Sequence, residues 1–177
     1  MLHILRHFKV QDDSKQWLNS QEFDSWVEEY DTLTLQYFDI NLPQNIDKVY
    51  VSSQKRAVKT ADFLGLKYET SDLLVEVGIK AFIDTQLRFP KWFWLFIGRI
   101  LWYFGLTSCE TKNMTNQRME TFISQIDFDK NILIVSHGFF MVQLMKKLKT
   151  LGYGSDIKIN IKNGKFYTLS FDTKRLG

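Results

Sequence analysis

The feature that most constrains the fold is a run of four aliphatic residues at 132–135, which is followed at once by Ser136-His137-Gly138. A continuous, largely β-branched run without polar alternation is typical of a strand buried on both faces, as the strands of parallel sheets are. Two further short segments rich in apolar residues occupy 2–5, which His3 interrupts, and 49–51, and segments with helical spacing of apolar residues lie between them. The pattern predicts an α/β fold of three layers, in which a mainly parallel sheet lies between helices.

The expected elements follow from the spacing of apolar residues and from turn signals. Strands are expected at residues 2–5, 49–51, 67–69, 132–135, 157–161 and 165–171. Helices are expected within residues 20–38, after a cap at Ser52 or Ser53, from Pro90 to about residue 104 with Gly105 as its stop, at 116–126 and at 140–148. The Asn163-Gly164 turn signal predicts that the last two strands form an antiparallel hairpin at the edge of the sheet.

Length and charge limit the class of protein. The 177 residues contain no repeat or linker, so a single domain over residues 1–177 is expected. The net charge of +3, without a dense Lys/Arg stripe, predicts no nucleic-acid partner. The only cysteine, Cys109, cannot form an intramolecular disulfide and favours a reducing compartment, so a cytoplasmic location is expected.

No targeting or transmembrane segment is expected. The first apolar run is stopped by Arg6 and His7, which is not typical of a signal peptide. The longest membrane-like stretch, residues 92–106, contains Arg99 and is shorter than the roughly 20 residues needed to cross a bilayer.

Charged and polar groups follow three of the expected strands, namely Arg6-His7, Ser52-Ser53 with Arg56 nearby, and Ser136-His137. Because ligands of such sheets bind outside the carboxyl ends of the strands, these groups are expected to meet in one crevice. Two guanidiniums and two imidazoles suit a tetrahedral oxyanion, and a neutral imidazole can attack phosphorus. Metal binding by the two histidines is the alternative, but two arginines oppose a cation and no third ligand is evident.

These segments resemble the histidine phosphatase superfamily, which includes the cofactor-dependent phosphoglycerate mutases. Members have a strand ending in Arg-His-Gly, a Ser-Pro-x-x-Arg-Ala-x-x-Thr-Ala segment, a Leu-x-Glu step, and an apolar strand followed by Ser-His-Gly. The corresponding segments here are Leu5-Arg6-His7-Phe8, Ser52-Ser53-Gln54-Lys55-Arg56-Ala57-Val58-Lys59-Thr60-Ala61, Leu74-Val75-Glu76, and Ile134-Val135-Ser136-His137-Gly138. The resemblance implies a phosphoglycerate mutase-like fold.

The resemblance also implies the roles of the site residues. His7 would be the nucleophile that becomes phosphohistidine, Arg6, Arg56 and His137 would bind the phosphoryl oxygens, and Glu76 would protonate the leaving group. The catalytic residues are therefore expected to be His7, Glu76 and His137, with no metal and no cofactor. The expected activity is hydrolysis of a phosphomonoester of a small molecule. A mutase that returns the phosphoryl group to a bound acceptor, and a domain that binds a phosphorylated ligand without cleaving it, are the alternatives.

Three departures from the family pattern bear on the substrate. Phe8 stands where the family has glycine, which implies either backbone strain at Phe8 or a different bend of the loop. Residues 20–35 replace the usual Leu-Thr-x-x-Gly-x-x-Gln-Ala segment. The insert at about 82–106 is unusually aromatic. Because the last two regions normally shape the substrate site, the substrates of the family are not carried over.

Three alternatives are open for the aromatic insert. It could be a helix buried on most faces, including one at a homodimer interface. It could also cap the catalytic crevice, where Arg99 would face a substrate, or make peripheral contact with a membrane.

Overall fold

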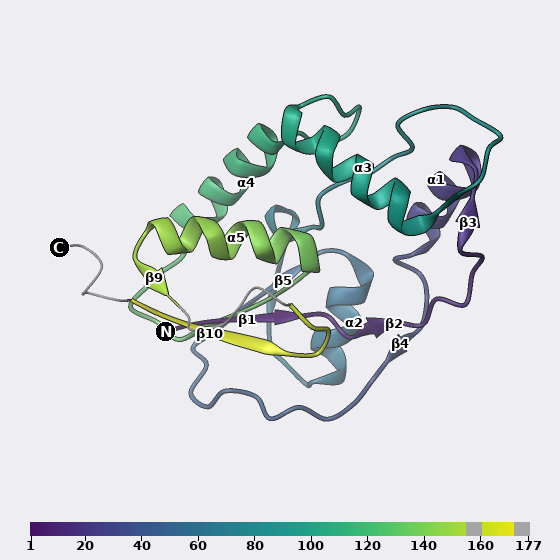
Figure 1. Cartoon of the computed structure of the whole chain (residues 1–177). Coiled ribbons are helices and arrows are strands. Elements are labelled where there is room, and N and C mark those ends of the chain that lie inside the picture. The colour runs from purple at the N-terminus through teal and green to yellow at the C-terminus, as the bar shows by residue number, and fades with distance from the viewer. Residues whose placement is uncertain (155–160, 172–177) are drawn as a thin grey trace.

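The computed structural model describes residues 1–154 and 161–171. Within these residues a six-stranded sheet has the order β6 (Glu69–Ser71), β5 (Lys48–Ser52), β8 (Ile132–Ser136), β1 (Leu2–Arg6), β10 (Phe166–Phe171) and β9 (Tyr153–Gly154). The first four strands are parallel, whereas β10 runs antiparallel to β1 and β9 runs antiparallel to β10. The prediction of a mainly parallel sheet with an antiparallel edge is therefore confirmed (Figure 1).

The antiparallel edge begins at the predicted turn. Asn163-Gly164 forms a turn just before β10, and Gly164 has a left-handed φ of 63°, which glycine adopts at little cost. From this turn β10 runs beside β1, in a register that pairs Leu5 with Phe166 and Leu2 with Leu169. Of the strand expected at 157–161, residues 157–160 lie outside the described part of the chain.

Helices cover both faces of the sheet and form the outer two layers (Figure 1). On one face, α4 (Lys112–Ser124) and α5 (Gly138–Thr150) pack against inward-pointing side chains such as Ile4 and Ile134. On the other face, α2 (Lys55–Phe63) packs through two alanines, whose small side chains let the helix lie close to the strands. The three-layer α/β/α prediction is confirmed.

The remaining elements are short strands and helices outside this sandwich, namely β2 (Lys9–Val10), β3 (Trp17–Leu18), α1 (Ser20–Glu29), β4 (Leu35–Gln36), the 3₁₀ helix η1 (Asp72–Leu74), β7 (Phe89–Pro90) and α3 (Lys91–Phe104). The rings of Phe23 and Trp94 stack at 5.3 Å and join α1 to α3. As predicted, α3 ends at Gly105, which is left-handed with φ 72°. No helix among the described residues is long and apolar enough to cross a membrane.

The start of α2 differs from the prediction that Ser52 or Ser53 caps it. The N-cap residue is Gln54, and its side chain makes no capping hydrogen bond. The carboxylate of Asp31 instead accepts hydrogen bonds from the amides of Lys55 and Arg56, at 2.8 and 3.2 Å. The cap is therefore supplied by a residue that lies far away in the sequence.

Candidate active site

His7 lies just beyond the last residue of β1, and its side chain is almost fully buried. Its Nδ1 is 2.6 Å from the carbonyl oxygen of Phe8. Because a carbonyl only accepts hydrogen bonds, Nδ1 carries the proton and Nε2 holds the free lone pair. Two contacts hold this bend of the chain: Asn163 Nδ2 donates to the carbonyl of His7 at 2.9 Å, and the amide of Phe8 donates to Thr60 Oγ1 at 3.0 Å. The ring is thus oriented as a nitrogen nucleophile.

His137 follows β8 on the neighbouring strand, and the two rings lie with their centroids 5.1 Å apart. His137 is completely buried and contacts His7, but it does not line the adjacent cavity. Its Nε2 is 2.7 Å from the hydroxyl oxygen of Ser52 at the end of β5. Three parallel strands therefore bring their carboxyl ends to this point, as predicted for a sheet of this kind.

Both imidazoles are electrically neutral. Burial, reinforced by the charge of Arg56, lowers the pKa of His7 from 6.5 to about 3. The same two causes, in the same order, lower the pKa of His137 well below its ordinary value. A neutral His7 keeps its Nε2 lone pair available for attack across the physiological pH range.

Arg6 is the last residue of β1, and its guanidinium lies against Gly138, the first residue of α5. Its Nη1 donates to the carbonyl of Ile161 at 2.8 Å. A Cβ atom at Gly138 would stand 2.8 Å from Arg6 Cζ, closer than real side chains approach. The glycine after His137 is therefore the residue that makes room for this arginine.

Arg56 lies in the first turn of α2 and is held by two neighbours. Its Nη1 donates to Asp31 Oδ1 at 2.8 Å, and its Nη2 donates to Gln54 Oε1 at 3.0 Å. The same Gln54 oxygen accepts the amide of Glu76 at 3.0 Å. These contacts fix the guanidinium and join it to the loop that carries the predicted acid.

Three buried side-chain nitrogens have no hydrogen-bond partner in the described part of the chain, namely Arg6 Nε, Arg56 Nε and His137 Nδ1. No other buried side-chain nitrogen or oxygen of the described residues is left without a partner. Buried polar groups are normally satisfied, and unpaired ones mark strain, ligand sites or catalytic sites. Here all three belong to the four residues predicted to hold an oxyanion.

Glu76 follows η1, and its carboxylate lies at the N-terminus of α5. The amides of Phe139 and Phe140 donate to it at 3.1 and 2.9 Å, and its own neighbour Val77 donates at 3.0 Å. Arg118 holds the segment that precedes Glu76, because its Nη1 donates to the carbonyls of Leu73 and Val75 at 2.8 Å each. The carboxyl group is therefore fixed in position, with backbone donors holding both oxygens.

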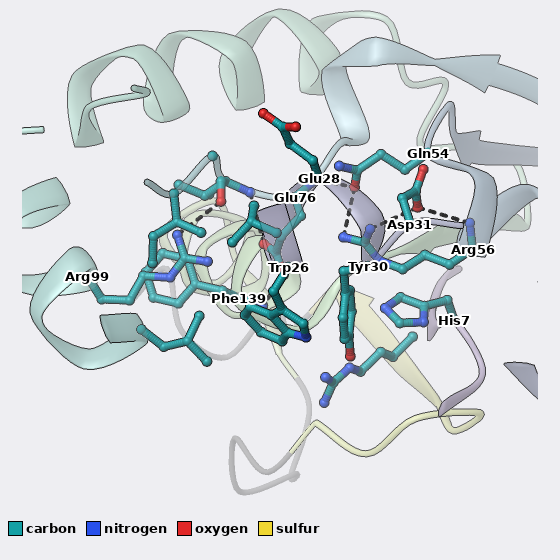
Figure 2. A pocket seen from close by; sticks show the side chains of 16 residues that line it. His7, Trp26, Glu28, Tyr30, Asp31, Gln54, Arg56, Glu76, Arg99 and Phe139 are labelled. Carbon is teal, nitrogen blue, oxygen red and sulfur yellow. Dashed lines mark hydrogen bonds and ion pairs between the residues drawn. The ribbon is translucent and has the colours of Figure 1, made fainter. Parts of the chain in front are cut away.

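A cavity of about 540 Å³ brings Arg6, His7, Arg56 and Glu76 together. Its other walls combine the rings of Trp26, Tyr30 and Phe139, the polar or charged side chains of Glu28, Asp31, Gln54 and Arg99, and the residues Val27, Val77, Gly78, Ile79 and Leu95. Figure 2 shows His7 and Arg56 on one side of this cavity and Arg99 on the other. The space is large enough for a small molecule attached to a phosphoryl group.

Arg99 comes from α3, so the aromatic insert forms part of the cavity wall. Its Nη1 donates to the carbonyl of Val77 at 3.0 Å, and its guanidinium lies over the ring of Phe139, 4.1 Å from the centroid. In the described residues no carboxylate lies within ion-pair distance of it. The insert thus forms part of the wall of the crevice.

Phe8 carries no strained backbone. Among the described residues only Asn45 is a non-glycine residue with positive φ, so the loop bends without the left-handed conformation that glycine would allow. The Phe8 ring is fully buried and packs against Tyr37, Phe38 and Phe63, with centroids 4.9–5.7 Å away. It therefore belongs to a small core beside β2 and β4 and does not line the cavity.

Sequence reasoning missed several residues of this site. Two of them, Tyr30 and Asp31, lie in a segment where no family motif was found, and Gln54 occupies a variable position within a motif. All three contact Arg56, but the local sequence does not indicate these contacts. In residues 1–154 and 161–171 no group of three or more His, Cys, Asp or Glu side chains is arranged to hold a metal ion.

Comparison with known proteins gives a family match and a shared fold. The family model for the "Histidine phosphatase superfamily (branch 1)" matches residues 40–176, a stretch that includes Arg56, Glu76 and His137 but not Arg6 and His7. No curated protein sequence matches the chain.

Solved structures extend the likeness over most of the chain. The Rv3214 protein of Mycobacterium tuberculosis is 14% identical with a TM-score of 0.56, and the alignment covers 96% of this chain and 94% of that one. An Escherichia coli protein proposed to be an alpha-ribazole-5'-P phosphatase is 17% identical with a TM-score of 0.54 and the same coverage. Phosphoserine phosphatase of Entamoeba histolytica, solved with 3-phosphoglyceric acid, is 13% identical with a TM-score of 0.50, covering 97% and 96%. At these identities the likeness is one of fold.

Proposed function

Because the chain belongs to the histidine phosphatase superfamily, we propose that it is a phosphomonoester hydrolase in which His7 is transiently phosphorylated. The observation that carries this proposal is the set of three unpaired buried nitrogens on Arg6, Arg56 and His137. A phosphoryl group offers several acceptor oxygens, and preorganised donors of this kind stabilise the charge of its transition state.

The state of His7 supports the first step. With Nδ1 donating to the carbonyl of Phe8, Nε2 can form a bond to phosphorus while the phosphorus–oxygen bond to the leaving group breaks. The two arginines would neutralise the oxygens of the transferred group, and the unpaired Nδ1 of His137 would donate a hydrogen bond to it. The low pKa of His7 keeps the nucleophile unprotonated.

Glu76 is the proposed acid and base. It would give a proton to the leaving oxygen in the first step. In the second step it would take a proton from the water that attacks phosphorus, which breaks the bond to Nε2 and releases inorganic phosphate. Its place on the cavity wall and its fixed orientation support this role.

The substrate that we propose is a phosphorylated small molecule. Beyond the phosphoryl site the cavity offers flat apolar surfaces on Trp26 and Phe139 and the guanidinium of Arg99, which favours a leaving group with an anionic or hydrogen-bonding end. The free thiol of Cys109 fits a reducing compartment, so the cytoplasm is the proposed location.

The decisive experiment is to trap the phosphoenzyme. Wild-type protein is mixed with para-nitrophenyl phosphate between pH 5 and pH 8 and quenched in alkali, and the acid-labile phosphate on the chain is mapped by mass spectrometry. We expect turnover and phosphate on His7, and we expect His7→Ala to lose both. His3→Gln is the matched control, because His3 also lies in β1 but bonds to Thr168 and lies outside the cavity.

Three results would contradict the proposal. Absence of hydrolysis over the whole pH range would leave a ligand-binding domain as the better account. Retained activity in His7→Ala would mean that another site performs the reaction. A phosphoenzyme that is stable in water and decays only when an alcohol or sugar phosphate is added would identify a mutase.

A further inference from the structure

One face of α3 carries large apolar side chains that remain substantially exposed. The exposed members of this outer face are Trp92, Phe96, Ile100, Tyr103, Phe104 and Leu106, with between 38% and 70% of each residue accessible. The first four follow one another at spacings of three and four residues, which places them along one side of the helix. Phe104 ends the helix beside them, and Leu106 follows the C-cap Gly105. The opposite side is buried through Trp94, Gly98 and Trp102, so α3 is apolar on both its inner and its outer face.

Lysine side chains border this outer face. From residue 85 to residue 109 the sequence contains no Asp or Glu. The cations of this stretch are engaged away from the outer face, because Arg88 pairs with Glu22, Lys91 pairs with Asp12, and Arg99 donates to the carbonyl of Val77. Lys112 lies over the ring of Tyr103, with its Nζ 3.9 Å from the centroid. The cation is therefore held directly beside the aromatic side chains.

More lysines border a hollow next to the outer face. This hollow, of about 550 Å³, lies between the second half of α3, α4 and α5, and both Lys146 and Lys147 line it. Lys147 forms an ion pair with Glu120. In the described residues neither Lys112 nor Lys146 has a carboxylate within ion-pair distance.

We infer that the outer face of α3 docks on an anionic lipid surface. Tryptophan, tyrosine and phenylalanine side chains are favoured at the boundary between headgroups and acyl chains, and lysines beside them attract anionic headgroups. A symmetric dimer through the same face would bring Lys112 and Lys146 of each copy against the same positive surface, which disfavours a second copy as the occupant.

Docking would take place next to the proposed catalytic cavity. Arg99 and Phe139 line both that cavity and the hollow beside the outer face. The inference does not depend on catalysis, because lipid binding can be measured on a protein that hydrolyses nothing.

The test is sedimentation of the full chain with vesicles. We expect binding to vesicles of phosphatidylcholine mixed with phosphatidylglycerol, little binding to phosphatidylcholine alone, and weaker binding as salt is added. Phe96→Ser should lower partitioning by about tenfold, since it removes one inserted ring. Phe63→Ser is the matched control, because Phe63 is 46% exposed on α2, on the opposite face of the sheet.

The electrostatic part has its own matched pair. Lys146→Glu should weaken binding to the mixed vesicles, whereas Lys67→Glu, an exposed lysine after α2 with the same effect on net charge, should not. Circular dichroism of each variant establishes that it is folded.

Three results would overturn the inference. The first is that the protein sediments equally with and without anionic lipid. The second is that Phe96→Ser leaves vesicle binding unchanged. The third is that analytical ultracentrifugation finds a dimer that Phe96→Ser dissociates. The last result would mean that a second copy covers this face.

Discussion

Asp31 holds Arg56 in two ways at once. Its Oδ1 accepts a hydrogen bond from the guanidinium at 2.8 Å, and the same carboxylate caps the first turn of α2, on which that arginine stands. The side chain and the backbone that carries it are thus fixed by one residue from a different part of the chain.

We predict that Asp31→Ala lowers kcat/KM toward para-nitrophenyl phosphate by about a hundredfold, because a displaced oxyanion donor loses most of its effect. Inhibition by vanadate should weaken in parallel, whereas a purely structural loss would not change affinity in the fraction that is folded. Loss of the cap should also cost about 1 kcal/mol of stability. Asp39→Ala, at an exposed aspartate that forms no ion pair in the described structure, serves as the control. Unchanged vanadate affinity in Asp31→Ala would contradict the positioning role.

We predict that Glu76→Gln separates substrates by their leaving groups. Alkyl phosphates should be hydrolysed more slowly by on the order of a hundredfold or more, because their leaving alkoxides need a proton. Aryl phosphates should lose much less in the phosphorylation step, which is measured as the rate of nitrophenol release in a single turnover. The single carbonyl oxygen of glutamine can still accept the amides of Phe140 and Val77, so two of the three backbone contacts that hold the loop should remain. Equal losses on both substrate classes would exclude Glu76 as the acid.

We predict that Gly138→Ala damages activity without damaging the fold. The added methyl group would lie 2.8 Å from Arg6 Cζ, so the guanidinium must shift away from its present position. Alanine in the first turn of α5 should leave stability unchanged or slightly higher, because glycine is the poorer helix residue. Steady-state kinetics and a thermal unfolding curve on the same sample measure the two effects. Full activity would mean that Arg6 can move without consequence for the reaction.

We predict that the folded state loses stability as the pH is lowered from 7 to 5. His7 and His137 have pKa values below 6.5 when folded, so in this range the unfolded chain binds protons that the folded chain does not. Protonation then favours unfolding, by about 1.4 kcal/mol per pH unit for each imidazole once the pH is below its unfolded pKa.

The measurement is the free energy of unfolding in urea at several pH values. The slope of the unfolding free energy against pH should be smaller in His7→Gln than in wild type, by the contribution of about one proton. The carboxylates contribute equally to both proteins. Identical slopes would mean that His7 is accessible to protons in the folded state.

Local sequence patterns predicted the helices and strands better than the contacts between distant segments. The segments rich in apolar residues at 2–5, 49–51 and 132–135 each became a strand of the parallel sheet, because such a segment has few ways to avoid water except between two layers of helices. The expected site residues followed directly, since Arg6, His7, Ser52 and His137 adjoin the carboxyl ends of these strands. The turn at Asn163-Gly164 and the stop at Gly105 were local signals of the same kind, set by backbone conformation.

The sequence by itself thus determined which chemical groups this chain can bring together, because strand periodicity and chain direction put the ends of parallel strands at one edge. Tertiary structure alone decided what surrounds them. The carboxylate of Asp31 and the guanidinium of Arg99 reach the cavity from segments with no motif. The side of α3 that remains exposed was equally hidden in the sequence, because the helix is apolar all round and only packing selects the face that is buried.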